Sequence, residues 1–222
     1  MKNAHAALKT AIAAKGVDVP DGTKLTDMPA LVEQISTEPV PTNPRAVFAY
    51  DKSASIVVPN MMVVDMTTIT NLAYFFYDCK SLKSLTLPAG FGSNATDINN
   101  CFSGCRGLVS LTLPAGFGSN ATNIRTCFNN CQSLTSLTLP AGFGSNATDI
   151  RNCFWQCKVL KSLTLPAGFG QNAKNISYCF EADYKLSSLT LPDGFGSVAT
   201  DIRRCFYTCI NLVDLHLPKG FG

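Results

Sequence analysis

Ten cysteines are the residues of this chain that could do chemistry, because a thiolate can bind a metal ion, form a disulfide or attack a substrate. Most occur as Cys-x-x-x-Cys pairs that recur every 26 residues. Zinc sites usually show Cys-x-x-Cys spacing, and the two histidines, His5 and His216, are remote from the pairs. We therefore predict no metal and no other cofactor. In an alignment of the repeat, the cysteines occupy two columns of equivalent positions. The first is Cys101, Cys127, Cys153, Cys179 and Cys205, and the second is Cys79, Cys105, Cys131, Cys157 and Cys209.

Disulfides and free thiols are the two remaining alternatives for these cysteines. Equivalent cysteines in stacked copies could approach the Cα separation of ~5.5 Å that a bridge needs. Columns of five cannot pair completely, and the segment from Met1 to Ala14 lacks the features of a secretory signal. We expect reduced thiols that fill a core, in a chain that is not exported by a signal peptide. Asp183 stands where the second column predicts a cysteine, and we expect it near solvent.

Several function classes find no support in the sequence. It contains no grouping of Ser, His and Asp, no phosphate-binding loop and no His-Glu-x-x-His helix. A net charge of +3 is too small to demand nucleic acid, and no apolar run of about 18 residues could insert into a membrane. We therefore predict a protein that is not an enzyme, with no nucleic-acid partner and no membrane insertion.

A 26-residue repeat must position the cysteines, and it predicts the fold. Self-similarity at this period is typical of a solenoid, in which each copy covers its apolar face by stacking on the next. Leu82-x-x-Leu85-x-Leu87 matches the leucine-rich-repeat signature, and its period of two predicts a strand with one buried face. We expect six such strands in one parallel sheet, beginning at Leu82, Leu108, Leu134, Leu160, Leu186 and Leu212.

The rest of the repeat predicts a turn and a short helix. Pro-Ala-Gly-Phe-Gly should end the strand, and Ile98, Cys101, Phe102 and Cys105 have the spacing of an amphipathic helix of about two turns. The expected fold class is an α/β solenoid: a right-handed leucine-rich-repeat stack with a parallel sheet on one face and short helices on the other. Two phenylalanine ladders should fill its core: Phe76, Phe102, Phe128, Phe154, Phe180 and Phe206, and Phe91, Phe117, Phe143, Phe169, Phe195 and Phe221.

The chain divides into four expected segments. Residues 82–222 are the regular solenoid, and residues 46–81 are a degenerate coil that caps it. Residues 39–45 form a proline-rich linker. Residues 1–38 show two apolar helical patterns and are expected to be a small helical hairpin, a possible attachment segment that precedes the solenoid.

The copies differ mainly on the expected helix side, where aromatic and arginine side chains replace small ones. These types dominate the hot spots of protein interfaces. The alternative is drift on a solvated face without a partner, because isolated exposed aromatics are normal. The outward strand positions, in contrast, are almost uniformly Ser and Thr. The candidate partner-binding residues are Arg125, Arg151, Trp155, Tyr178, Tyr184, Arg203, Arg204 and Tyr207.

Two resemblances bear on function. The strand Leu-x-Ser-Leu-Thr-Leu-Pro with Cys-Phe-x-x-Cys-x-x-Leu resembles the BspA-like leucine-rich repeats of bacterial surface antigens, over residues from about 68 to 222. The segment from Ala11 to Ile35 is similar to a short helical segment of phage and prophage tail or tail-fibre proteins. The signature positions of the first family are Phe102, Cys105, Leu108, Leu111, Leu113 and Pro114.

The resemblances imply a binding or adhesion module, either a phage or prophage tail-associated receptor-binding protein or a bacterial surface-type interaction protein. Its ligand would be a protein or a cell-surface glycan, and residues 1–38 would attach it to a virion. A virion-associated or cytoplasmic location is then expected. The alternative is an assembly protein that forms a homo-oligomer through its last coil, around Leu215 and Leu217. A third hypothesis is binding of ice through the rows of Ser and Thr.

Overall fold

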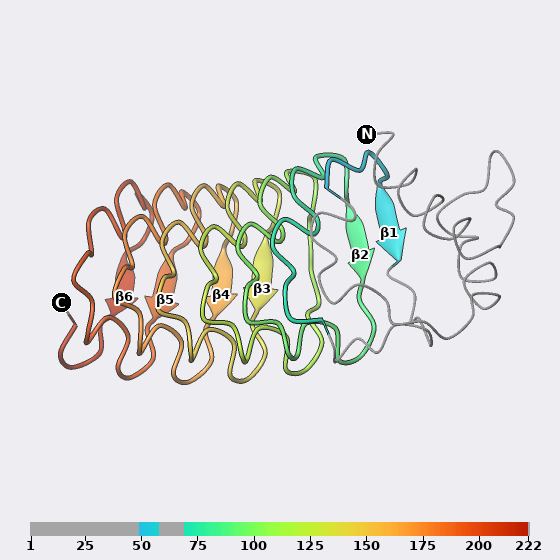
Figure 1. Cartoon of the computed structure of the whole chain (residues 1–222). Helices are drawn as coiled ribbons and strands as arrows, with labels where there is room; N and C mark the ends of the chain where they lie inside the picture. Colours follow the sequence, from blue (N-terminus) through green and yellow to red (C-terminus); the bar gives the residue numbers. More distant parts are fainter. Residues whose placement is uncertain (1–48, 58–68, 222) are drawn as a thin grey trace, which may run out of the picture.

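The computed structural model describes residues 49–57 and 69–221. These residues form a stack of similar coils that follow one another in a nearly straight row (Figure 1). The expected hairpin and linker, and residues 46–48 and 58–68 of the capping coil, lie outside the described residues. Within the described ranges, no helix is long and apolar enough to cross a membrane.

The strands are three residues long and carry the predicted alternation. In β2 to β5 the two outer side chains are exposed and the central leucine is buried, because only the central position points into the stack. In the last strand the central leucine, Leu215, is half-buried. The strands are β1 (Ser55–Val57), β2 (Ser84–Thr86), β3 (Ser136–Thr138), β4 (Ser162–Thr164), β5 (Ser188–Thr190) and β6 (Asp214–His216).

The strands pair in parallel, but they do not form the single sheet that the sequence predicted. The pairs are β1 with β2, β3 with β4, and β5 with β6. Residues 110–112 carry the same Ser-Leu-Thr as β2 to β5 and form no strand, so the strand sequence alone does not determine where pairing stops. Between regular coils the register follows the repeat, with Leu137 opposite Leu163. In the capping coil the register is offset by three residues, because Ser55 pairs with Ser84, which is 29 residues later (84 − 55) instead of 26.

The expected short helices are absent from the described residues. The segments of the repeat from Ile98 to Cys105 and its equivalents are chains of overlapping turns, in which alternate N–H groups donate to the carbonyl three residues back. The other N–H groups donate to carbonyl oxygens of the next coil, at 2.8–3.0 Å in the coil of residues 98–105. The donors there are Ile98, Asn100, Phe102 and Gly104.

Coil spacing explains why turns replace helices. Helix axes pack 8–10 Å apart, whereas hydrogen-bonded parallel backbones lie about 4.8 Å apart. A helix in every coil would force the stack to fan out on that side. Here both sides keep the strand spacing, because parallel bridges such as Asp97 with Asn123 join successive coils on the turn side too. The i, i+3, i+4, i+7 apolar pattern is compatible with either backbone, so it misled the sequence-based prediction.

Both phenylalanine ladders are confirmed as the core. In the ladder that begins at Phe76, successive rings lie 5.4–5.5 Å apart with interplanar angles of 2–8°. In the ladder that begins at Phe91 the separations are 6.0–6.2 Å and the angles 4–12°. Identical rings stacked in offset planes bury a large apolar area in every coil. The stack is therefore held by side chains that no single coil could cover.

The cysteines lie in the same core. All ten are free thiols, and only Cys209 is partly exposed. Burial raises the pKa of the Cys131 thiol to about 12, so it stays protonated at neutral pH. The expectation that Asp183 lies near solvent is wrong, because its exposed fraction is 0%.

Candidate interaction surface on the turn face

The turn face, which we define as the side chains of residues 71–79 and of the equivalent segments in later coils, is built on a column of Asn and Asp. Each member accepts a hydrogen bond through its side-chain oxygen from the N–H two residues later, at 2.9–3.3 Å. Such Asx turns start each chain of turns in the same way. The column, which we call the Asx column, is Asn71, Asp97, Asn123, Asp149, Asn175 and Asp201.

Asn and Asp alternate strictly along the Asx column. Its members face one another through parallel bridges, so neighbouring side chains lie one coil apart, about 4.8 Å. Because every second member is a neutral amide, two carboxylates never occupy adjacent rungs. This alternation avoids the repulsion of stacked like charges.

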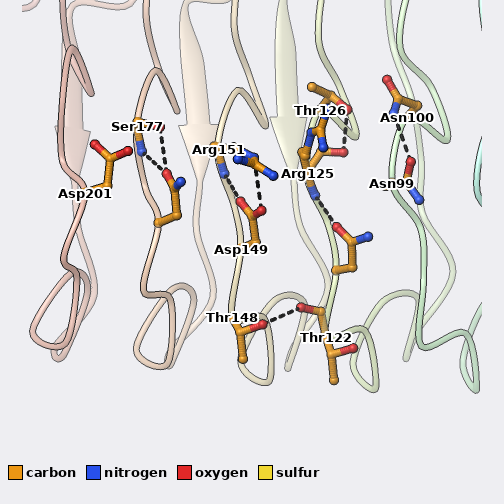
Figure 2. Close-up of polar contacts among 12 residues, drawn as sticks. Asn99, Asn100, Thr122, Arg125, Thr126, Thr148, Asp149, Arg151, Ser177 and Asp201 are labelled. Atoms are coloured by element: carbon orange, nitrogen blue, oxygen red, sulfur yellow. Dashed lines mark hydrogen bonds and ion pairs between the residues drawn. The ribbon is translucent and has the colours of Figure 1, made fainter.

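Two candidate arginines are positioned by this column. Arg151 Nε lies 3.0 Å from Asp149 Oδ2, and Figure 2 shows the guanidinium folded back against that carboxylate. Arg203 makes two hydrogen bonds to Asp201, at 2.9 and 2.8 Å. This pair lowers the pKa of Asp201 to about 2. Both guanidinium groups are therefore tied to the Asx column, although the Arg203 side chain is still 75% exposed.

A second group joins a cation to aromatic rings. The guanidinium carbon of Arg204 lies 5.9 Å from the ring centre of Tyr178 and 5.0 Å from that of Tyr207. Both distances are in the range of cation–π attraction. Tyr178 precedes Arg204 by one coil, so the contact joins two neighbouring coils. We call Trp155, Tyr178, Arg204 and Tyr207 the aromatic patch.

The other candidates are less closely gathered. Trp155 is half-buried, in the same column as Tyr207 and two coils before it. Arg125 is exposed beside Arg151 on the preceding coil, as Figure 2 shows. Tyr184 is 36% exposed, and its carbonyl accepts a hydrogen bond from Asn211. The structure thus joins Tyr178 and Tyr207 through Arg204, leaves Trp155 and the other arginines as separate residues on the turn face, and places Tyr184 one residue beyond it.

Several variable positions that the sequence placed in water are buried instead. Ser103, Thr126 and Ser177 are at most 9% exposed. Small side chains here fold onto their own backbone, as when the Thr126 hydroxyl donates to the Arg125 carbonyl at 2.6 Å. On the turn face, therefore, these short side chains are buried, and the long ones reach the surface.

Sequence reasoning missed a tyrosine cluster at the other end of the same face. Tyr77 packs edge-on against Tyr50 and Tyr74, with ring centres 5.5 and 5.3 Å apart. Tyr74 and Tyr77 occupy the columns of Tyr178 and Tyr207, so the 26-residue period could have revealed them. Tyr50 lies in the irregular first coil, where the 26-residue period does not hold, and its N–H donates to the Tyr77 carbonyl at 2.7 Å.

The strand face is flatter and more uniform. Two shallow grooves cross it where strand pairing is interrupted, between residues 110–113 and 136–140 and between β4 and β5. Their walls are Ser and Thr hydroxyls with the edges of Leu and Pro side chains. No group of three or more His, Cys, Asp or Glu side chains could hold a metal ion in the part of the chain that the structure describes.

A stack of short parallel strands, Gly turns and leucine columns defines a leucine-rich-repeat solenoid. The family model for the BspA type leucine rich repeat region matches residues 67–213 in six copies. The chain therefore belongs to the BspA-type leucine-rich repeat proteins. Among curated proteins, none matches this sequence.

Two solved structures are similar in fold. A leucine-rich repeat protein from Bacteroides ovatus is 24% identical with a TM-score of 0.57, over 78% of this chain and 40% of that one. A leucine rich cell surface protein from Faecalibacterium prausnitzii is 22% identical with a TM-score of 0.52, over 78% of this chain and 42% of that one. The chain thus spans less than half the length of these two proteins.

Proposed function

We propose that the chain is a non-enzymatic binding module that contacts a protein partner through the aromatic patch. The observation that carries this proposal is the stacking of Arg204 over Tyr178 and Tyr207, which arranges a cation and two rings on the surface before a partner binds. A side chain that is already ordered loses less conformational entropy on binding. Trp, Tyr and Arg are also the residue types that dominate interface hot spots.

The surroundings of the aromatic patch support a protein ligand. Antibody binding loops combine rigid Tyr and Trp anchors with adaptable Ser, Gly and Asn side chains. The outward side chains of the turn face likewise combine aromatic and arginine residues with half-buried amides. These amides are Asn99, Asn100, Asn129, Asn130 and Asn152.

The proposal is tested by binding of the purified chain to arrays of bacterial surface proteins and of glycans. We expect binding to one or more proteins, weakened at least tenfold, or about 1.4 kcal/mol, in Tyr207→Ala and Arg204→Ala. Tyr207 is 55% exposed, so its removal should leave the melting temperature nearly unchanged.

Thr164→Ala is the matched control, because Thr164 is exposed on β4 of the strand face. If this variant weakens binding and the two aromatic-patch variants do not, the strand face is the contact surface and the proposal is wrong. Binding to glycans alone would replace the protein ligand by a cell-surface sugar.

A second candidate function is self-assembly through the last coil. Strand β6 pairs with β5 and with no other described strand, and three apolar side chains beside it are unusually exposed. Exposed fractions reach 75% for Ile210, 88% for Val213 and 52% for Leu217. A second copy could cover these side chains and pair with the free edge of β6.

Sedimentation over a range of concentrations distinguishes this candidate. We expect the native chain to form oligomers that Val213→Lys abolishes, while Tyr207→Ala leaves them intact. A native chain that stays monomeric at every concentration would exclude assembly through this edge.

We further propose a role at a phage tail, with residues 1–38 as the attachment segment, and this rests only on the similarity of residues 11–35. Mass spectrometry of particles purified after prophage induction should then detect the chain in stoichiometric amount. Particles that lack the chain would contradict this role and leave the binding proposal untouched.

A further inference from the structure

The second cysteine column is a row of hydrogen-bond donors. In four coils its Sγ lies 2.8–3.3 Å from the carbonyl oxygen of a phenylalanine 29 residues earlier, in the preceding coil. Three of these four carbonyls already accept an N–H from their own coil, and a protonated thiol is a weak donor that can serve the second lone pair. The pairs are Cys105 with Phe76, Cys131 with Phe102, Cys157 with Phe128, and Cys209 with Phe180.

Asp183 occupies the missing place in this row. Its Oδ1 accepts a hydrogen bond from the N–H of Cys157 at 2.9 Å. Its Oδ2 is buried and has no hydrogen-bond partner among the described residues. Each of the four thiols donates to the carbonyl 29 residues earlier. A donor on the side chain of Asp183 would therefore reach the carbonyl of Phe154 (183 − 29 = 154).

Among residues 49–57 and 69–221, no cation contributes to the electrostatics of Asp183. The titratable groups that interact with Asp183 are four thiols: Cys153, Cys157, Cys179 and Cys209. Burial raises the pKa of Asp183 well above its ordinary value, and the hydrogen bond from Cys157 N–H opposes the increase without cancelling it. The site therefore has the surroundings of a carboxylic acid rather than a carboxylate.

We propose that Asp183 is a neutral acid that replaces the thiol of this row, with its Oδ2–H donating to the carbonyl of Phe154, and that its ionisation loosens the turns from Tyr178 to Tyr184. The two carboxyl oxygens have different partners. Oδ1 accepts from the backbone of Cys157, and Oδ2 donates to the backbone of Phe154. Burial also raises the pKa of the thiols in this row, so the carboxylic acid is the donor that loses its proton first as the pH rises.

This device would regulate the turn face, a consequence that depends on the proposed function. Asp183 lies in the same chain of turns as Tyr178, Glu181 and Tyr184. Those turns are tied to the next coil by hydrogen bonds such as Ala182 N–H to the Tyr207 carbonyl, at 3.0 Å. Opening them to solvate an ionised Asp183 would separate the ring of Tyr178 from Arg204 and Tyr207.

The direction of the pH effect follows from linkage. Since the pKa of Asp183 is higher in the folded than in the unfolded chain, the folded state binds the proton more tightly. The stabilisation is complete below the unfolded pKa of about 3.9 and is lost as the pH rises toward the folded pKa. Over that interval the unfolding equilibrium constant should rise by up to about tenfold for each pH unit.

The test compares native chain with Asp183→Cys, which restores the row, by chemical unfolding between about pH 4 and about pH 8. We expect the variant to be increasingly more stable than the native chain as the pH rises. Asp193→Asn, at an exposed site of the next turn, is the matched control and should show a constant difference. A constant difference for Asp183→Cys would overturn the proposal.

Two further measurements keep the test decisive if Asp183→Cys folds poorly. The infrared band of a protonated carboxylic acid should be present in the native chain near neutral pH and absent in Asp183→Asn. Hydrogen exchange at residues 178–184, corrected for its intrinsic pH dependence, should accelerate with pH in the native chain only. An ionised Asp183 in the folded chain, or exchange that matches Asp183→Asn at every pH, would contradict the proposal. Neither readout needs a binding partner, so the result is independent of the proposed function.

Discussion

The two faces of each coil are stabilised in opposite ways. On the strand face the side chains hardly vary between copies, yet backbone pairing is interrupted twice. On the turn face the outward side chains vary between copies, yet each of the five junctions between residues 72 and 209 has four backbone hydrogen bonds of 2.7–3.4 Å. The backbone of the turn face therefore sets the register, and its outward side chains are free to change. This division explains how a rigid stack can present a variable surface.

The largest expected effect comes from breaking one turn-face junction. Asn152 has φ 56° and its N–H donates to the Ser177 carbonyl at 3.0 Å. Proline lacks the N–H and fixes φ near −65°, so Asn152→Pro should lower the free energy of unfolding by about 3 kcal/mol or more. Ser110→Pro should cost about 1 kcal/mol or less, because Ser110 N–H makes no hydrogen bond within the described residues. Chemical unfolding measures both, and equal losses would contradict the division of roles.

A second experiment separates backbone strain from steric clash at the turns that link the faces. Gly90 and Gly118 both have left-handed backbones, with φ 77° and 68°. A Cβ at Gly118 would lie 2.7 Å from the ring of Phe143, whereas a Cβ at Gly90 would contact nothing within 4 Å. We expect Gly90→Ala to cost about 1 kcal/mol from strain, and Gly118→Ala about 2–4 kcal/mol from strain and overpacking. Similar losses of stability for the two variants would show that Phe143 can move to accommodate the added methyl group at little cost.

The alternation of the Asx column predicts a smaller and salt-dependent effect. Asn123→Asp would place carboxylates on three adjacent rungs, at 97, 123 and 149. At about 5 Å and partial exposure, the added repulsion should cost about 1 kcal/mol in low salt and less in high salt. Asn175→Asp is a parallel case, between Asp149 and Asp201. A melting temperature unchanged at both salt concentrations would show that the alternation has no electrostatic role.

The smallest expected effect is a gain in stability. Thr126 has φ 55°, which a β-branched residue rarely adopts, and the equivalent residues of the flanking coils are Asn100 and Asn152. Thr126→Asn should raise the free energy of unfolding by about 0.5–1 kcal/mol, because Asn tolerates the left-handed region better. Thr122→Asn, at an exposed site of the same coil, is the control and should give no gain. A loss of stability in Thr126→Asn would show that the Thr126 hydroxyl bond to Arg125 outweighs the strain.

The strands and the core were predictable from sequence because their signals are local and repeated. Ser-Leu-Thr alternation fixes which side chains face inward, and a period of 26 residues fixes which phenylalanines stack. The turn face was not predictable to the same degree. Its apolar spacing suits a helix, and only the competition with inter-coil hydrogen bonds, which sequence spacing does not show, selects turns with left-handed residues such as Tyr178 and Ala182.

The candidate surface was predicted only as a set of columns. The period placed Tyr178, Arg204 and Tyr207 on neighbouring coils, but their mutual contact depends on rotamers that no pattern specifies. The same limit applies to Asp183. An aspartate in a column of cysteines can mean either that the position is exposed or that a buried carboxyl group replaces the thiol. Burial in three dimensions decides between the two. The roles of the eight candidate residues in partner binding remain a proposal.

The identical junctions on the turn face have a consequence for the reach of the molecule. Because the same four hydrogen bonds join any coil to the next, one complete 26-residue unit can be gained or lost without disturbing the units on either side. Each such event would lengthen or shorten the rod by about 4.8 Å and bring a different pair of outward residues together at the new boundary. Duplication of one repeat within the gene would therefore create a new surface in a single step, while the fold stays the same.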